Sequence, residues 1–187
     1  AGKKFLVDCG MEQGENVYEN VELPVSPNDI DAMLLTHAHI DHSGHIPYVS
    51  ANGFSAPIYT TSATDRLCRI MLMDSAHIQE FEAEWKNRKA ARSGAPKVEP
   101  LYTIEDAENV KQYVTTCEYG EDVELCEGVS VRFDDAGHLL GSACITVTAT
   151  ENGVTKVLIN YETVPEPATA TLGLLGLGGL LLRRKRQ

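Results

Sequence analysis

The hydrophobic positions in the first third of the chain form short runs that are separated by polar stretches. Three of these runs predict buried strands, at residues 4–8, 31–36 and 57–60. Residues 45–51 predict a short helix that ends at Asn52 and Gly53. Residues 12–28 are polar, with Gly, Pro and Asn among them, and predict a loop. The first third is therefore expected to consist of strands joined by loops and one short helix.

A long helical pattern follows, from about residue 63 to about residue 92. Thr61 or Ser62 is the candidate N-cap, with Asp65 close behind, and the Ser-Gly-Ala-Pro sequence at residues 93–96 ends the helix. Apolar side chains at helical spacing predict the face that the helix buries, namely Leu67, Ile70, Met71, Ile78 and Phe81.

The second half of the chain begins with a shorter helix and continues as strands. A capping-box pattern that starts at Thr103 predicts a helix over residues 105–114. From residue 116 the hydrophobic positions alternate or form short runs, and these predict strands at residues 123–125, 129–133, 143–149 and 154–159. Strands, then helices, then strands predict sheet layers covered by helices, within the α/β (α+β) class.

The composition changes at residue 164, which predicts a boundary between a domain at residues 1–163 and a tail at residues 164–187. The tail opens on Val-Pro-Glu-Pro, continues as an apolar, Gly-rich stretch at residues 168–182 and ends in four basic residues. Fifteen helical residues span roughly 22 Å, which is short of the hydrocarbon core of about 30 Å. Two interpretations remain open, a short or transient membrane anchor with a cytoplasmic basic end and a buried C-terminal helix.

The composition excludes some classes of function. The formal net charge is −11, which argues against a broad basic face for nucleic acid but leaves room for a nucleic-acid substrate held locally by metal ions. The five cysteines are odd in number and widely spaced, as is typical of reduced thiols in a cytosolic protein. Residues 1–8 are not a signal peptide, and without an initiator Met the chain is expected to begin inside a longer protein.

The densest chemistry lies in residues 36–45, directly after the second predicted strand. Here His37, His39, Asp41 and His42 stand close together. Imidazole and carboxylate are ligands that Zn²⁺ takes at about 2.0–2.2 Å. His37 and His39 can turn to one metal, and Asp41 and His42 can face a second. The alternative is a polar surface loop.

A second polar segment, at residues 134–142, lies between two predicted strands and contains His138. Gly137 and Gly141 allow the sharp backbone turns that would present this side chain. His138 could complete a set of three histidines with His37 and His39. Three protein ligands leave one position for water, which is the pattern of catalytic zinc sites.

The His-x-His-x-Asp-His pattern at residues 37–42 resembles the signature of the metallo-β-lactamase fold. Four further stretches resemble its β-CASP branch of RNA-processing nucleases, at residues 7–14, 53–59, 72–76 and 136–143. The resemblance covers residues 1–159. It implies an αββα sandwich, two zinc ions, an RNA substrate and a cytoplasmic location.

Residue by residue, the resemblance assigns one zinc to His37, His39 and His138, and the second to Asp41 and His42. It also implies that Asp41 orients the attacking water and that the Asp8 carboxylate orients the metal loop from behind the ligands. For Asp8 the alternative is a turn residue at a strand end.

The chain departs from this family after its last predicted strand. Where the family has a Thr/Ser-Gly-Asp turn whose Asp bridges two metals, the sequence here is Asn160-Tyr161-Glu162, so Glu162 is a candidate bridging ligand. The β-CASP insert and the strands before Phe5 are also absent from the sequence. We therefore expect an incomplete sandwich, reduced activity, and self-association through an exposed sheet edge.

The tail resembles a PEP-CTERM sorting signal, which implies processing by an exosortase at the membrane. An envelope or secreted location conflicts with the cytoplasmic location of RNA-processing relatives. A fragment of a longer or chimeric reading frame would explain this, as would an exported hydrolase with an upstream signal. The functional hypotheses are an impaired zinc-dependent ribonuclease, a non-catalytic zinc-binding envelope module, and a small-molecule ester hydrolase of the same fold.

Overall fold

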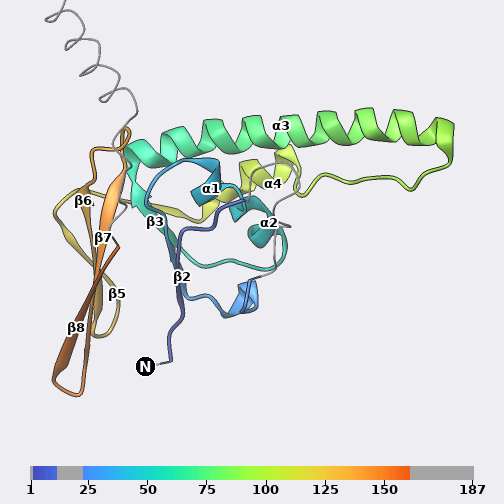
Figure 1. The fold of residues 1–187 in the computed structure, drawn as a ribbon. Helices are drawn as coiled ribbons and strands as arrows, with labels where there is room; N and C mark the ends of the chain where they lie inside the picture. Colours follow the sequence, from blue (N-terminus) through green and yellow to red (C-terminus); the bar gives the residue numbers. More distant parts are fainter. Residues whose placement is uncertain (1, 12–22, 161–187) are drawn as a thin grey trace, which may run out of the picture.

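In a computed structural model of the chain, residues 2–11 and 23–160 are described. Their layers run from helices through a parallel sheet to an antiparallel sheet, and the helices lie on one side of the molecule (Figure 1). The predicted α/β class and the sandwich of two sheets are confirmed. In the described ranges, helices cover only the outer face of the parallel sheet, so the expected incompleteness is on the antiparallel side.

The parallel sheet has the strand order β1-β2-β3-β4. Its strands are β1 (Phe5–Val7), β2 (Ala32–Leu34), β3 (Ile58–Thr61) and β4 (Val114–Cys117). Side chains alternate across the strands, so Met33 packs among the helices and Leu34 packs against the second sheet. The three predicted early strands are therefore confirmed. Strands β2 and β3 are almost wholly buried because apolar layers lie on both sides of this sheet, whereas β1 at its edge is only partly buried and Val7 is exposed.

The helices are α1 (Ile40–Ser43), α2 (Ile46–Ala51), α3 (Ser62–Ser93) and α4 (Ile104–Asn109), with 3₁₀ turns at Pro27–Asp29 and Val110–Gln112. Thr61 is the N-cap of α3, since its side chain accepts a hydrogen bond from the Thr64 backbone N–H. Gly94 ends α3 in the left-handed conformation, with a φ of 71°. The predicted capping box of Thr103 and Asp106 is present.

The predicted helix at residues 105–114 is too long. The α-helix ends at Asn109, a 3₁₀ turn follows, and Val114 begins strand β4 opposite Ile58. The hydrogen bond from the Ile58 N–H to the Tyr113 carbonyl leads the chain into the sheet. Pairing with a buried strand thus outweighs the local helix preference.

The antiparallel sheet is a meander of β5 (Asp122–Cys126), β6 (Val129–Asp135), β7 (Ala143–Glu151) and β8 (Val154–Asn160). All four predicted strands are confirmed. Val131 pairs with Val147 and Phe133 with Ile145, and these residues pack with Leu34 between the two sheets.

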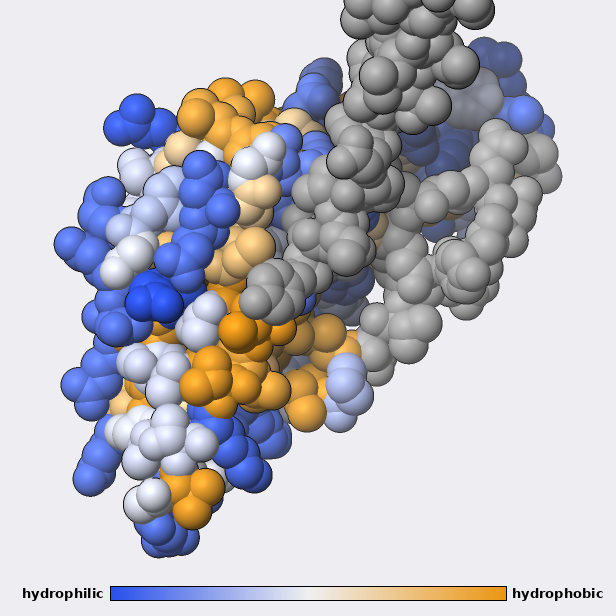
Figure 2. Space-filling view, turned by 60° about the vertical axis from the view of Figure 1, so that its left-hand side comes forward, coloured by the Kyte–Doolittle hydropathy of each residue, from blue (hydrophilic) through white to orange (hydrophobic). Residues whose placement is uncertain are grey.

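Strand β8 is the exposed side of this sheet. In the described part of the chain it pairs with β7 and with no other strand. Val157, Leu158 and Ile159 are all exposed, and Figure 2, which brings this side of the molecule forward, shows apolar side chains at the surface beside polar ones. The expected exposed edge is therefore present among the residues that the structure describes.

The predicted buried face of α3 is wrong. Of its five members only Leu67 is partly buried, whereas Ile70, Met71, Ile78 and Phe81 are exposed. The buried face is formed by smaller side chains and one leucine, namely Thr64, Cys68, Leu72, Ala76, Ala83 and Ala90. Small residues let the helix lie close to its neighbours, and the larger apolar side chains point outward.

Two further features concern the membrane and the thiols. In the ranges 2–11 and 23–160, no helix is long and apolar enough to cross a bilayer; the predicted apolar helix at residues 168–182 lies outside these ranges. The five cysteines are unpaired. Burial raises the pKa of the Cys9 and Cys68 thiols to about 12, so both stay protonated near neutral pH.

Candidate metal centre

Three histidine side chains meet at one end of the parallel sheet. His37 and His39 lie on the loop between β2 and α1, and His138 comes from the loop between β6 and β7. The distance from His37 Nε2 to His39 Nδ1 is 3.0 Å, and that from His39 Nδ1 to His138 Nε2 is 3.2 Å. One ring nitrogen from each of the three histidines lies within 4.8 Å of the others. Residues that are 99 positions apart thus form one cluster.

The donor set fits a zinc ion. In a tetrahedral site with Zn–N bonds near 2.0–2.1 Å, ligand nitrogens lie about 3.3 Å apart. The two measured nitrogen–nitrogen distances, 3.0 and 3.2 Å, are close to this separation. At such distances two ring nitrogens either share an N–H···N hydrogen bond or direct both lone pairs at a common cation.

Thr36 and Asp8 fix the orientation of His37. The Thr36 hydroxyl donates to the Asp8 carboxylate at 2.8 Å, and its oxygen lies 2.9 Å from His37 Nδ1. Because the single hydroxyl proton goes to the carboxylate, the oxygen accepts from the His37 Nδ1–H. This network assigns the His37 lone pair to Nε2, the nitrogen that faces the other histidines.

Asp8 also contacts His42. Its Oδ2 lies 2.9 Å from His42 Nδ1, and its Oδ1 accepts the backbone N–H of Thr36 at 2.8 Å. The same reasoning places the His42 lone pair on Nε2. Asp8 has a φ of 58°, which is rare for a residue with a side chain. The Asp8 carboxylate therefore holds the backbone at Thr36, where the histidine loop starts, and the His42 imidazole on the side away from its Nε2.

A tight contact between two loops sets the position of Asp41 and His42. A Cβ on Gly10 would lie 1.6 Å from the Asp41 carbonyl oxygen, so only glycine fits there. The Cys9 N–H donates to the His42 carbonyl at 2.7 Å. The chain after β1 therefore lies in direct backbone contact with the turn that carries Asp41 and His42.

Asp41 and His42 lie beside the three-histidine cluster. The His42 ring centroid is 4.1 Å from that of His37, and His42 Nε2 is 3.8 Å from the Asp41 carboxylate. The Asp41 side chain is 66% exposed, so its carboxylate is open to solvent and to a bound substrate. Glu162, the candidate bridging ligand, lies outside the described residues.

The loop that carries His138 is held by Ser142. Its hydroxyl oxygen accepts the backbone N–H groups of His138 and Leu139 at 3.1 and 3.2 Å. The N–H of Ala143 donates to the Thr36 carbonyl at 2.9 Å, which ties this loop to the histidine loop. Sequence reasoning missed both Ser142 and Thr36. Their signal was small, a hydroxyl residue directly beside a candidate ligand or glycine.

Gly141 is packed against the start of α3. Its carbonyl accepts the hydroxyls of Thr61 and Thr64 at 2.6 and 2.7 Å. Its φ is 89°, and a Cβ there would lie 2.4 Å from the Thr64 backbone nitrogen. The helix start therefore positions the His138 loop, a contact that the sequence analysis did not predict.

The cluster favours uncharged imidazole at His37. Burial, and then the charges of His42, His39 and His138, lower the pKa of His37 to about 4, with Asp41 acting in the opposite direction. Neutral histidine is the form that binds metal. His45, at the start of α2, also has its pKa lowered by burial, and its ring packs on Tyr48 at 4.8 Å rather than in the cluster.

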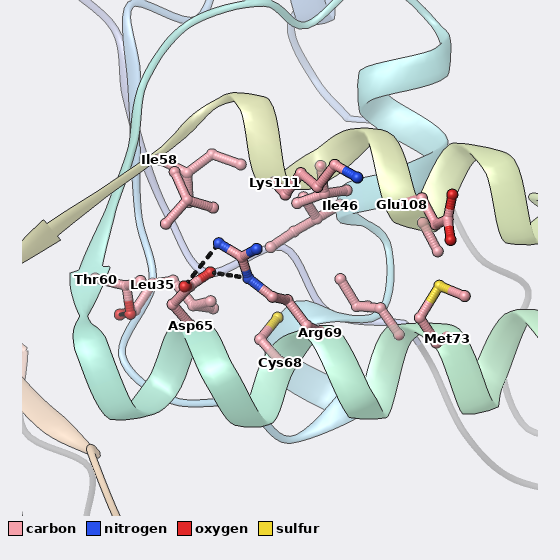
Figure 3. Close-up of a pocket in the computed structure, with 14 residues that line it drawn as sticks. Leu35, Ile46, Ile58, Thr60, Asp65, Cys68, Arg69, Met73, Glu108 and Lys111 are labelled. Atoms are coloured by element: carbon pink, nitrogen blue, oxygen red, sulfur yellow. Dashed lines mark hydrogen bonds and ion pairs between the residues drawn. The ribbon is translucent and has the colours of Figure 1, made fainter.

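A separate cavity lies away from the histidines. It has a volume of about 190 Å³ and opens between α3, α4 and the parallel sheet (Figure 3). Its walls are mainly apolar, and Asp65 and Arg69, which form an ion pair, are among its lining residues. None of the three histidines lines it, so it is not part of the candidate metal centre.

A comparison with models of protein families shows the superfamily to which the domain belongs. Residues 1–161 match the model of the metallo-beta-lactamase superfamily domain. This chain belongs to that superfamily. Residues 163–186 match the PEP-CTERM protein-sorting motif.

Curated proteins that are similar to this chain include a ribonuclease and a transcription termination factor. Ribonuclease TTHA0252 of Thermus thermophilus is 35% identical over 145 residues, which are 77% of this chain and 29% of that protein. Transcription termination factor FttA of Pyrococcus abyssi is 32% identical over 148 residues, 75% of this chain and 20% of that factor. The predicted resemblance to the nuclease branch and to a PEP-CTERM tail is confirmed. The chain spans less than a third of the length of these relatives.

Solved structures include subclass B3 metallo-β-lactamases. MEM-A1, isolated from a soil metagenome library, is 19% identical, covers 73% of this chain and 43% of its own, and has a TM-score of 0.43.

Proposed function

We propose that this chain is a zinc-dependent hydrolase of RNA phosphodiester bonds, in which His37, His39 and His138 hold a zinc ion. The observation that carries the proposal is the meeting of three ring nitrogens within 4.8 Å. The ligands come from two loops that hydrogen bonds join at Thr36 and Ala143. Three protein ligands leave a position for water, as in catalytic zinc sites.

The surrounding residues have distinct roles in this proposal. A bound zinc ion lowers the pKa of its water toward neutrality, so hydroxide is available at pH 7. Asp41 and His42 contribute to a second metal position, and the exposed Asp41 carboxylate orients the attacking water. Asp8 orients His42 directly and His37 through Thr36. Glu162 is the candidate bridge between the two positions.

RNA is the proposed substrate class because the curated relatives include a ribonuclease and transcription termination factors. The net charge of −11 means that metal ions, rather than a broad basic face, would hold the phosphodiester. The chain spans 29% of the Thermus ribonuclease. We therefore expect slower cleavage by this chain than by such a longer relative.

A second candidate function rests on the tail. The match of residues 163–186 to a PEP-CTERM sorting motif supports an envelope-directed module that is processed by an exosortase and keeps zinc for stability. This location competes with the cytoplasmic one suggested by the RNA-related relatives. Detection of a cleaved domain outside the cytoplasm would favour the module.

The first experiment measures metal per chain by elemental analysis after purification without chelator, together with cleavage of a labelled RNA. His138→Ala is the test variant, and His77→Ala, an exposed histidine on α3, is the matched control. We expect bound zinc and RNA cleavage in the wild type and the control, and loss of both in His138→Ala. Zinc without cleavage would favour the module, and turnover of a thioester or lactone without RNA cleavage would favour a small-molecule hydrolase. A chain without metal would overturn the proposal.

A further inference from the structure

The outward face of α3 carries a mainly apolar stripe, which Asp74 interrupts. The residues that follow one another at alternating steps of four and three are Leu67, Met71, Asp74, Ile78, Phe81 and Trp85. Phe81 is 60% exposed and Trp85 is 54% exposed. Alternating steps of three and four are the spacing by which one helix packs along another. Five of the six members are apolar, and all of these except the partly buried Leu67 are exposed, so the stripe exposes side chains that such a contact would bury.

The opposite face of α3 is already occupied. Ala83 and Ala90 are buried there, and the Asn87 side chain makes two hydrogen bonds of 2.8 Å with the backbone of Val98. The segment after α3 therefore runs back beneath the helix, as Figure 1 shows. The outward stripe has no such cover from the described residues.

From residue 74 onward the charges along α3 are segregated, whereas Asp65, Arg66 and Arg69 are mixed in sign near its start. Between residues 74 and 84 the charged side chains are acidic, with Asp74, Glu82 and Glu84 exposed. Between residues 85 and 92 they are all basic, namely Lys86, Arg88, Lys89 and Arg92. A parallel pair of such helices would place like charges together. An antiparallel pair that is centred between Ile78 and Trp85 places Asp74 of one helix beside the basic residues 88–92 of the other.

The basic half has a hollow that fits this arrangement. Trp85, Arg88, Lys89 and Arg92 line a shallow hollow of about 380 Å³. The Lys89 ammonium lies 5.6 Å from the centre of the Trp85 ring. The hollow thus combines an aromatic wall with cationic groups, which suits a carboxylate beside an apolar side chain.

We propose that α3 is a dimerisation helix, which pairs antiparallel with α3 of a second copy of this chain. The two-fold axis lies between Ile78 and Trp85, so Ile78 packs on the partner's Trp85 and Phe81 packs on the partner's Phe81. Asp74 then reaches the hollow that the partner's Arg88 and Arg92 line. The interface is independent of the metal centre and of the exposed β8 edge.

The mass of the full chain tests the proposal, by sedimentation velocity over a range of concentrations. We expect a reversible dimer in the wild type and a monomer for Phe81→Glu and Trp85→Glu, with unchanged circular dichroism. Leu158→Glu, at an equally exposed apolar position on β8, is the matched control and should stay dimeric. A wild type that remains monomeric would overturn the proposal. Loss of the dimer in the control alone would place the interface at the sheet edge and also overturn it.

A charge exchange tests the antiparallel direction. Asp74→Arg should weaken the dimer at least tenfold, and so should the pair Arg88→Asp and Arg92→Asp. Combining all three changes should restore dimerisation. If the basic-half variants lose affinity for a single-stranded RNA oligonucleotide and leave the mass unchanged, the hollow binds RNA, and the proposal is wrong.

Discussion

Oδ2 of Asp8 lies 2.9 Å from His42 Nδ1, and the same carboxylate accepts the hydroxyl proton of Thr36. One partly buried acid therefore orients two imidazoles, one directly and one through a hydroxyl. The charge sits behind the candidate ligands and not among them, where it raises the basicity of both rings. Its position explains why a residue far from the histidines in sequence belongs to the same centre.

Replacing Asp8 by Asn should weaken zinc binding by about 10- to 100-fold. The amide oxygen can still accept from Thr36, but the amide nitrogen cannot accept the proton of His42 Nδ1. Competition with a chromophoric chelator measures the affinity. Asp31→Asn is the control, because Asp31 pairs with Lys3 at the surface. Equal zinc affinity in Asp8→Asn and the wild type would show that Asp8 is only a turn residue.

Replacing Gly141 by Ala should destabilise the domain by more than about 2 kcal/mol, since the added Cβ would meet the Thr64 backbone in addition to the unfavourable φ. Gly120→Ala isolates the cost of φ alone. Gly120 has a φ of 75°, and no atom lies within 4 Å of the position that a Cβ would take there. Urea denaturation of both variants, with zinc affinity as a second readout, measures the difference. Equal losses of stability in Gly141→Ala and Gly120→Ala would mean that the His138 loop moves away from α3 at little cost in free energy.

Much of this arrangement follows from sequence patterns. The apolar runs locate the strands, and the capping box of Thr103 and Asp106 locates α4, because both signals are local. The cluster of His37, His39 and His138 was predicted partly from spacing and partly from family resemblance. Its geometry depends on the hydrogen bond of Thr36 with Asp8 in another loop and on that of Ser142 within the His138 loop, which no sequence pattern reveals.

The orientation of α3 shows where pattern reasoning fails. A hydrophobicity pattern selects the stripe with the larger side chains, such as Ile70 and Phe81. The folded chain instead buries Cys68, Ala76 and Ala83, because close approach to the neighbouring helices favours small residues. The strand Val114–Cys117 was not among the predicted strands, since its stability comes from pairing with β3 rather than from local preference.

A pair of substitutions on α3 tests this orientation. Leu72→Ala should destabilise the domain by about 2–5 kcal/mol, because Leu72 is 1% exposed and its loss leaves a cavity. Ile70→Ala should change stability by less than about 0.5 kcal/mol, because Ile70 is 67% exposed. Thermal and urea unfolding at low protein concentration keep any association out of the comparison. A larger loss of stability in Ile70→Ala than in Leu72→Ala would show that α3 buries the face that was predicted from the sequence.

The metal-free protein should lose stability as the pH falls from about 6.5 to about 4. In the folded chain the pKa of His37 is lowered to about 4 by burial and by the neighbouring imidazoles, whereas an unfolded histidine titrates near 6.5. The unfolded state therefore binds more protons in this window. The stabilisation is fully present above pH 6.5, and about 3 kcal/mol is lost as the pH falls through the folded pKa.

Urea unfolding measured at several pH values in the presence of a chelator tests this prediction. The dependence of the unfolding midpoint on pH should have a shallower slope for His37→Gln than for the wild type. His45, whose pKa burial also lowers, leaves a residual slope in that variant. The exposed His77 provides the control, since His77→Gln should keep the wild-type slope. An unchanged slope in His37→Gln would mean that the cluster opens to water before it accepts a proton.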